Sequence, residues 1–337
     1  MTVMTLAGTD IRWTCNEGDT VMRSALRAGL GFPYECNVGS CGNCRFDLVE
    51  GEAEDLRADP PGLSERDRAR GRRLGCQARP LGDCTVKLRM MPQYESRFRP
   101  VRQPATLVGV TDITYDIREF RFRLEHPAPF IPGQYALLSL PGVDGARAYS
   151  MANTGLDGAA EWHFQVRRVP DGAATTKLFE SLTVGERIEI DGPYGMAYLR
   201  EDSPRDIVCL AGGSGLSPMV SIARGAAASP ALKGRRIDFV YGGRAARDIC
   251  GREMLEELPG FGETIHYHPV VSGMAESDDG WDGYRGFVHE VAISLFSDRL
   301  VNSEIYFAGP PAMGQAIQKA LLDLGVPAAQ VHFDQFY

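Results

Sequence analysis

Four cysteines with uneven spacing constrain this chain more than any other feature of its sequence. Cys36, Cys41 and Cys44 share one short segment, and Cys76 lies on a separate one. The spacing C-x4-C-x2-C with a distant fourth cysteine is that of plant-type [2Fe–2S] sites. The intervening glycines let backbone N–H groups point at the sulfur atoms, which lowers the cost of the cluster's negative charge. The sequence therefore predicts a [2Fe–2S] cluster bound by these four thiolates.

Structural zinc is the alternative ligand for the same four thiolates. Zinc quartets usually carry a short C-x2–4-C pair on both sides, and here only Cys41 and Cys44 form such a pair. The spacing therefore favours iron–sulfur over zinc. The other cysteines have no partner in the sequence and are interpreted as buried thiols: Cys15, Cys84, Cys209 and Cys250.

Bulk composition limits the classes of partner. The formal net charge of −8 argues against nucleic-acid binding, which needs a basic surface. No apolar run approaches the ~20 residues of a membrane-spanning helix. The segment Met1–Leu6 lacks the basic and apolar parts of a secretion signal. We therefore expect a cytoplasmic protein with neither membrane nor nucleic-acid partners, in which the eight cysteines are not a disulfide framework.

The chain divides by pattern into three parts and a linker. Its 337 residues are enough for two or three domains. Residues 1–92 mix short apolar runs with one helical stretch, Thr20–Ala28, which Asp19 or Thr20 can cap and Gly29 can stop. Residues 93–103 are polar and suit a linker.

The pattern changes twice more after the linker. Residues 104–204 contain short alternating strands and Pro-Gly turns, which predict a small antiparallel β-barrel. In residues 205–337, apolar runs such as Ile207–Ala211 alternate with helical stretches such as Ala312–Leu324. This alternation predicts an α/β layer with a buried parallel sheet.

A second chemical signal is the run Arg147-Ala-Tyr149-Ser150 in the predicted barrel. A guanidinium can bind phosphate, an aromatic ring can stack on isoalloxazine, and a hydroxyl can hydrogen-bond the reactive edge of a flavin. Further along, the run Val166-Arg167-Arg168 is a candidate for contacts on the adenine side, and a solvated strand edge is the alternative for the two arginines. The turn from Gly172 to Thr175 is a candidate for binding the pyrophosphate.

A third signal is a glycine-rich turn that follows the apolar run Ile207–Ala211 and contains Gly212, Gly213 and Gly215. Between a strand and a helix, such a turn lets backbone amides approach a pyrophosphate at the helix N-terminus. Pro218 suits the first helical turn, where its missing N–H costs nothing. Because Pro218 stands where a third glycine would be, the turn differs from the common G-x-G-x-x-G fingerprint.

The order of these motifs resembles a known family. C-x4-C-x2-C…C, R-x-Y-S, G-G-x-G-x-x-P and A-G-P-P-x-M (308–313) occur in this order in the reductase components of bacterial aromatic-ring oxygenases. The resemblance covers essentially the whole chain. It implies a β-grasp ferredoxin domain (1–92), a linker (93–103), an antiparallel FAD-binding barrel (104–204) and an α/β nicotinamide-binding domain (205–337).

The resemblance also implies roles for individual residues. It assigns flavin binding to Arg147, Tyr149, Ser150 and Thr175, and places Tyr149 and Ser150 at the reacting edge. It assigns the nicotinamide dinucleotide to Gly212, Gly213, Gly215, Pro218, Gly309 and Pro310. The C-terminal Phe336 and Tyr337 resemble the segment that lies near the flavin face; a final strand packed on the core is the alternative. Ala308 stands where many relatives have a cysteine, so a thiol contribution to hydride transfer is absent.

The resemblance implies a monomeric enzyme that takes a hydride from NADH and passes single electrons through FAD and the cluster. The acceptor would be a terminal oxygenase or a separate ferredoxin. The residues of the turn 242–248 leave the choice of coenzyme open, because Arg244 and Arg247 could bind a 2′-phosphate whereas Asp248 could repel one. Only the resemblance favours NADH over NADPH. The alternatives are a reductase for a non-oxygenase acceptor, such as a deoxysugar dehydratase, and a non-catalytic metal-binding module.

Overall fold

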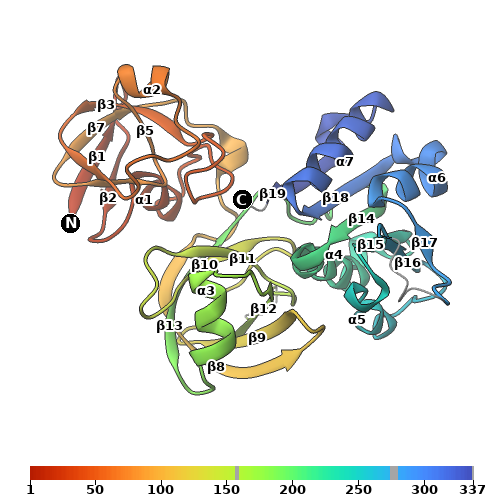
Figure 1. Cartoon of the computed structure of the whole chain (residues 1–337). Coiled ribbons are helices and arrows are strands. Elements are labelled where there is room, and N and C mark those ends of the chain that lie inside the picture. The colour runs from red at the N-terminus through yellow and green to blue at the C-terminus, as the bar shows by residue number, and fades with distance from the viewer. Residues whose placement is uncertain (156–158, 274–279, 336–337) are drawn as a thin grey trace. The chain divides into compact units, whose positions relative to one another are not determined.

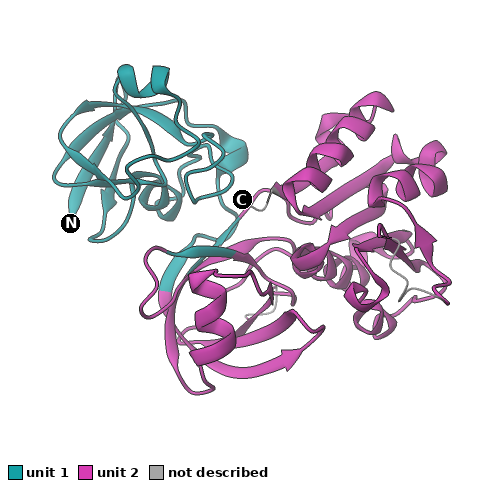
Figure 2. Cartoon of the chain, viewed as in Figure 1, with its two compact units in different colours: residues 1–102, 146–148, 191–194 teal, residues 103–145, 149–190, 195–337 magenta. Residues whose placement is uncertain are grey.

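The computed structural model describes residues 1–155, 159–273 and 280–335 (Figure 1). The chain forms two compact units (Figure 2). The first comprises residues 1–102, 146–148 and 191–194, and the second comprises 103–145, 149–190 and 195–337. Within the described ranges, every helix is too short or too polar to cross a bilayer.

The first unit is built on a mixed five-stranded sheet. Its strands follow the order β2 (Arg12–Cys15), β1 (Thr2–Leu6), β7 (Cys84–Lys87), β3 (Arg45–Glu50) and β5 (Arg72–Leu74). Strand β1 pairs antiparallel with β2 and parallel with β7. The smaller elements are β4 (Ala53–Asp55) and β6 (Ala78–Pro80), which pair with each other, α2 (Glu65–Ala69) and η1 (Pro92–Tyr94).

Helix α1 (Val21–Arg27) supplies much of the core of this unit. Its Met22, Ala25 and Leu26 are fully buried. Thr20 is the N-cap, and its hydroxyl accepts the N–H of Arg23. Gly29 follows the helix with φ +82°, a conformation that favours glycine at a helix end. The predicted helix is therefore confirmed, and of the two candidate caps Thr20 is the one used.

Most residues of a six-stranded, barrel-like sheet, here called the barrel layer, belong to the second unit. Its strands follow the order β11 (Arg147–Ser150), β10 (Tyr135–Ser139), β13 (Arg187–Tyr194), β8 (Val101–Asp112), β9 (Ile117–Leu124) and β12 (Glu161–Arg167). Strand β9 pairs antiparallel with both β8 and β12. Aromatic side chains that alternate along β9 and β12 fill its core, among them Phe120, Phe122, Trp162 and Phe164. Strand β8 begins at Val101, so the last predicted linker residues are already in the sheet.

The rest of the second unit is a fully parallel sheet with helices, as predicted. The strand order is β17 (Tyr284–Arg285), β16 (Ile265–Val271), β15 (Ile237–Gly243), β14 (Asp206–Gly212), β18 (Ser303–Gly309) and β19 (Val331–Gln335). All the pairs are parallel. The helices are α4 (Leu216–Ala228), α5 (Arg252–Glu256), α6 (Val288–Leu300) and α7 (Pro311–Asp323).

The strand order of this parallel sheet determines where a ligand can bind. The chain starts at the central β14, proceeds outward through β15 and β16, and then returns to β18 on the other side of β14. In such sheets, ligands bind beyond the carboxyl ends of the strands at the point where the direction reverses. That point lies between β14 and β18, where Ala211 pairs with Ala308. The glycine turn and the A-G-P-P run follow these two strands directly.

Candidate functional site

The cysteine loop presents backbone N–H groups to its own sulfur atoms. The amides of Ser40 and Cys41 both lie 3.3 Å from the Sγ of Cys36, and that of Asn43 lies 3.5 Å from the Sγ of Cys41. Gly42 has φ +77°, and a Cβ there would lie 2.5 Å from the carbonyl oxygen of Gly62. The loop therefore requires glycine at this position, and its amides can stabilise negative charge on the sulfurs.

The four cysteines come together as two pairs. The Sγ atoms of Cys44 and Cys76 lie 3.4 Å apart, and the thiols of Cys36 and Cys41 hydrogen-bond each other. No three ligating side chains of the described residues are close enough to hold one metal ion. Two pairs match two tetrahedral iron atoms, whereas zinc needs all four sulfurs around a single ion. The donor set therefore fits a [2Fe–2S] cluster.

One cysteine in each pair is prepared as a thiolate. The hydrogen bond from Cys41, together with the backbone amides, lowers the pKa of Cys36 to about 5. The hydrogen bond from Cys44 likewise lowers the pKa of Cys76. In each pair the partner thiol, Cys41 or Cys44, keeps the shared proton, and its own pKa is raised. Metal ligands of this kind bind in the deprotonated form, so both partner thiols must lose their protons when the cluster binds.

Two residues absent from the sequence prediction hold this loop in place. Asn37 is buried with φ +56°, and its side-chain oxygen accepts a 2.9 Å hydrogen bond from the Nε of Arg23. The side-chain amide of Gln77 lies 3.1 Å from the carbonyl oxygen and 3.6 Å from the Sγ of Cys76. Neither residue belongs to the cysteine spacing pattern, so only the three-dimensional structure identifies them.

The R-x-Y-S run forms strand β11 of the barrel layer. Arg147 is exposed, Tyr149 is half-buried and Ser150 is buried. The carbonyl of Ser150 accepts a 2.7 Å hydrogen bond from the hydroxyl of Ser217, on the first turn of α4. The end of this strand is therefore fixed to the helix that follows the glycine turn of the parallel sheet.

The predicted pyrophosphate turn lies at the start of a short helix, α3 (Ala173–Thr176). Gly172 is its N-cap. The Thr175 hydroxyl lies 3.1 Å from the carbonyl oxygens of both Val169 and Gly172, so it stabilises the turn. A Cβ on Gly172 would lie 2.7 Å from the Thr175 hydroxyl. Glycine thus avoids a close contact with the Thr175 side chain in this compact turn.

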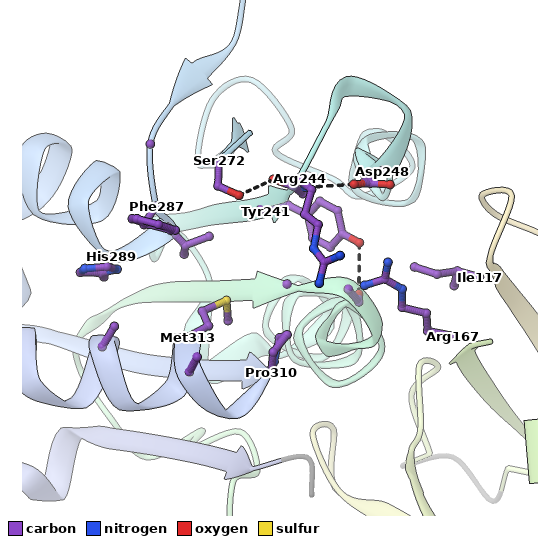
Figure 3. Close-up of a pocket in the computed structure, with 18 of the residues that line it drawn as sticks. Ile117, Arg167, Tyr241, Arg244, Asp248, Ser272, Phe287, His289, Pro310 and Met313 are labelled. Atoms are coloured by element: carbon purple, nitrogen blue, oxygen red, sulfur yellow. Dashed lines mark hydrogen bonds between the residues drawn. The ribbon is translucent and has the colours of Figure 1, made fainter. Parts of the chain in front are cut away.

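A cavity of about 500 Å³ opens at the reversal point of the parallel sheet (Figure 3). The residues after β14, β15 and β18 that line it include Gly212, Gly213, Arg244 and Pro310, and Met313 of α7 adds a sulfur atom. The Tyr241 hydroxyl donates to the Gly213 carbonyl over 3.1 Å and supports the turn from below. A cavity of this size suits part of a dinucleotide.

The glycine turn is packed too tightly for any side chain. A Cβ on Gly215 would lie 1.9 Å from the carbonyl oxygen of Ala308, and one on Gly212 would lie 2.7 Å from the Met313 sulfur. Gly213 has φ +56°. The turn leads directly into α4, with Pro218 in the first helical turn. Bare amides at a helix N-terminus form a site for phosphate groups.

Arg167 lies in this cavity, although its sequence position suggested the adenine side of a flavin. Adjacent residues of a strand point to opposite faces. Val166 is therefore buried in the core of the barrel layer, while Arg167 faces the glycine turn. Its guanidinium pairs with Asp116 over 2.6 Å and lies 3.2 Å from where a Gly213 Cβ would be. Arg167 thus supplies positive charge next to the turn.

Aromatic residues of the cavity carried no signal in the sequence. Phe287 and His289 line one wall, with stacked rings whose centroids are 5.9 Å apart. Phe287 is exposed, so its apolar face is available to a planar ligand.

Three family profiles match successive parts of the chain. They are described as a 2Fe-2S iron-sulfur cluster binding domain (residues 4–81), an oxidoreductase FAD-binding domain (104–198) and an oxidoreductase NAD-binding domain (209–319). The chain is 38% identical over 336 residues to the ferredoxin–NAD(P)+ reductase CarAd of Metapseudomonas resinovorans, with 96% of each chain covered. The chain belongs to this reductase family.

Two further reductases are similar over their whole length. The ferredoxin–NAD+ reductase component of the alkene monooxygenase system of Xanthobacter autotrophicus is 37% identical, covering 96% of this chain and 97% of the relative. The solved structure of the ferredoxin reductase in carbazole 1,9a-dioxygenase superposes with a TM-score of 0.91 at 33% identity, covering 100% and 98% of the two chains. The reductase is therefore an NAD(P)H-dependent oxidoreductase with a [2Fe–2S] cluster, FAD and a nicotinamide dinucleotide as its cofactors.

The structure of the reductase brings some of the predicted residues together. Gly212, Gly213 and Pro310 line one cavity. Gly215 and Gly309 meet beside it, since the backbone nitrogen of Gly309 lies 3.0 Å from where a Cβ on Gly215 would be. In strand β19, Phe333 stacks on Phe307 with ring centroids 4.8 Å apart. The remaining two predicted residues, Phe336 and Tyr337, lie outside the described residues, so their place at the flavin remains a prediction.

Proposed function

We propose that this reductase oxidises NADH and delivers electrons, one at a time, to a terminal oxygenase or its ferredoxin in the degradation of aromatic compounds. The observation that carries the proposal is the presence of all three sites in one chain, in the order cluster, flavin, nucleotide. Relatives that match along their length are named as components of carbazole, phenol and naphthalene oxygenase systems. A non-oxygenase acceptor is the second candidate.

The residues of the chain act by binding and positioning. When bound, FAD accepts a hydride from a nicotinamide and releases single electrons, which a [2Fe–2S] cluster carries onward. For that chemistry, we propose that Arg147, Tyr149 and Ser150 hold the flavin, with Gly172 and Thr175 at its pyrophosphate. The glycine turn with Arg167 would bind the dinucleotide phosphates, and the four cysteines would hold the cluster. No protein acid or base is required.

Reconstitution tests the proposed acceptor. The purified reductase should reduce cytochrome c with NADH and should support turnover of an aromatic-ring oxygenase from the same source. Metal analysis should give two iron atoms per chain and no stoichiometric zinc. Cytochrome c reduction without transfer to any oxygenase or ferredoxin partner would favour the non-oxygenase acceptor. A protein without flavin would support the non-catalytic module.

We also propose that the reductase prefers NADH to NADPH. Its support is the placement of Asp248 on the cavity wall, where a carboxylate repels a 2′-phosphate and can accept a hydrogen bond from a free 2′-hydroxyl. The expected result is a higher kcat/KM for NADH in steady-state reduction of cytochrome c. An equal or higher value for NADPH would contradict this preference and identify the arginines of the turn 242–248 as phosphate ligands.

Arg147→Ala is expected to weaken FAD retention. The change removes one charge-assisted contact to a phosphate, which corresponds to about 1.5–3 kcal/mol. Dialysis followed by flavin absorbance measures the loss. Arg123→Ala, which removes an exposed ion pair with Glu161 on another strand of the barrel layer, is the control and should keep its flavin. Full occupancy in the Arg147 variant would remove Arg147 from the proposed site.

We propose that the reductase works as a cytoplasmic monomer. The proposal follows from the sequence argument, because four cysteines held as cluster thiolates and four further free thiols suit a reducing compartment. Sedimentation of the cofactor-loaded protein should give the mass of one chain. A concentration-independent dimer would contradict the monomer.

A further inference from the structure

Tyr115, in the turn between β8 and β9, contacts the turn that follows β15. Its hydroxyl donates a 2.8 Å hydrogen bond to Oδ1 of Asp248. The guanidinium of Arg247 lies over its ring, 4.7 Å from the ring centroid. A single exposed side chain of the barrel layer thus engages two of the three charged residues in this turn, and those residues bear on the choice of coenzyme.

The hydrogen bond from Tyr115 is one of three that hold the carboxylate of Asp248 in place. The other carboxylate oxygen, Oδ2, accepts the backbone N–H groups of Arg244 at 2.9 Å and Ala245 at 3.1 Å. Both oxygens are therefore held, and the carboxylate lines the cavity (Figure 3). Burial disfavours its charged form, but the hydrogen bonds from Tyr115 and the backbone outweigh burial and lower the pKa of Asp248. A fixed negative charge results.

The contact with Arg247 separates the two arginines of the turn. Arg244 and Asp248 are the charged residues through which this turn lines the cavity, and Figure 3 shows the Arg244 side chain extending into it. Arg247 is held on the Tyr115 ring by a cation–π interaction instead. A 2′-phosphate is bound by clustered positive charge. With Arg247 held on the ring and Asp248 beside Arg244, this turn does not present both of its arginines to the cavity.

We propose that Tyr115 is a positioning residue for coenzyme selectivity, which disfavours NADPH by holding Asp248 at the cavity wall and Arg247 away from it. This inference rests on the proposed function, because it requires that the cavity bind the adenosine end of a nicotinamide dinucleotide. The residue acts from the barrel layer on a site of the parallel sheet.

The test compares the ratio of kcat/KM for NADH to that for NADPH in the cofactor-loaded enzyme. Tyr115→Leu removes both contacts and should lower the ratio about tenfold, mainly through a lower KM for NADPH. The reason is that the Arg247 guanidinium is released and the Asp248 carboxylate is held less firmly. Tyr115→Phe keeps the ring over Arg247 and should lower the ratio less. In the double variant Tyr115→Leu/Arg247→Ala the gain with NADPH should fall to that of Tyr115→Phe, because the released guanidinium is gone and only the loosened Asp248 remains.

Tyr284→Leu, a half-exposed tyrosine of the same parallel sheet outside the cavity lining, is the matched control and should leave the ratio unchanged. An unchanged ratio in Tyr115→Leu, with normal flavin content, would overturn the inference and leave the NADH preference intact. If Tyr115→Leu loses its flavin, Tyr115→Phe decides, and a ratio equal to the wild type overturns the inference. A wild-type enzyme that prefers NADPH would instead contradict the proposed NADH preference.

Discussion

Cys41→Ser is expected to remove or destabilise the [2Fe–2S] cluster and to reduce electron delivery to cytochrome c to background. Cys41 is paired with Cys36, and serine oxygen is a poor replacement for a thiolate on iron. Reduction of ferricyanide should persist, because this acceptor can take electrons at the flavin. Visible absorbance, iron content and the two acceptor assays measure the effect.

Cys84→Ser is the matched control for this variant. Cys84 is buried in the same unit, as are Cys44 and Cys76, but its thiol lies 3.4 Å and 3.3 Å from the carbonyl oxygens of Glu52 and Gly82. A serine hydroxyl can make the same hydrogen bonds, so the cluster and cytochrome c reduction should be retained. A normal cluster spectrum in the Cys41 variant would remove Cys41 from the ligand set.

Gly215→Ala is expected to impair binding of the dinucleotide while leaving flavin and cluster in place. The added Cβ would lie 1.9 Å from the backbone oxygen of Ala308, so the turn must move away from β18. Overpacking of this kind destabilises a fold by about 1–3 kcal/mol. If moving the turn weakens dinucleotide binding by the same free energy, the affinity falls roughly 5- to 150-fold. Steady-state KM for NADH and direct titration with NAD+ measure the change.

Gly314→Ala is the control, because it also adds a methyl group in place of a glycine hydrogen, on helix α7 beside the same parallel sheet. A Cβ at this position of α7 would have only an ordinary 3.7 Å contact with Phe307. Alanine also favours a helix interior over glycine by about 0.5–1 kcal/mol, so stability should rise slightly and KM should not change. An unaltered KM in the Gly215 variant would show that the turn does not approach the dinucleotide closely.

Sequence spacing was sufficient to predict the sites whose functional residues are neighbours in the chain. Three cluster cysteines fall in one segment with their glycines, and the glycine turn joins a strand to a helix directly, so both patterns are local. The parallel sheet was also predictable, because its strands are continuous apolar runs such as Val208–Leu210, which are buried on both faces. Helix α1 was predictable from another local signal, because Thr20 and Gly29 mark its two ends.

The tertiary structure decided what depends on residues far apart in the chain. Arg167 lines the cavity at the reversal point of the parallel sheet, because strand alternation buries Val166 and turns Arg167 toward the glycine turn. The division of the cysteines into two pairs, which matches the two iron atoms of the cluster, requires Sγ distances. The sequence determined which chemical groups this reductase carries, since they follow from local spacing. Folding determined which groups meet, as with Tyr115 and Asp248, because strand pairing and packing bring together residues that no local pattern connects.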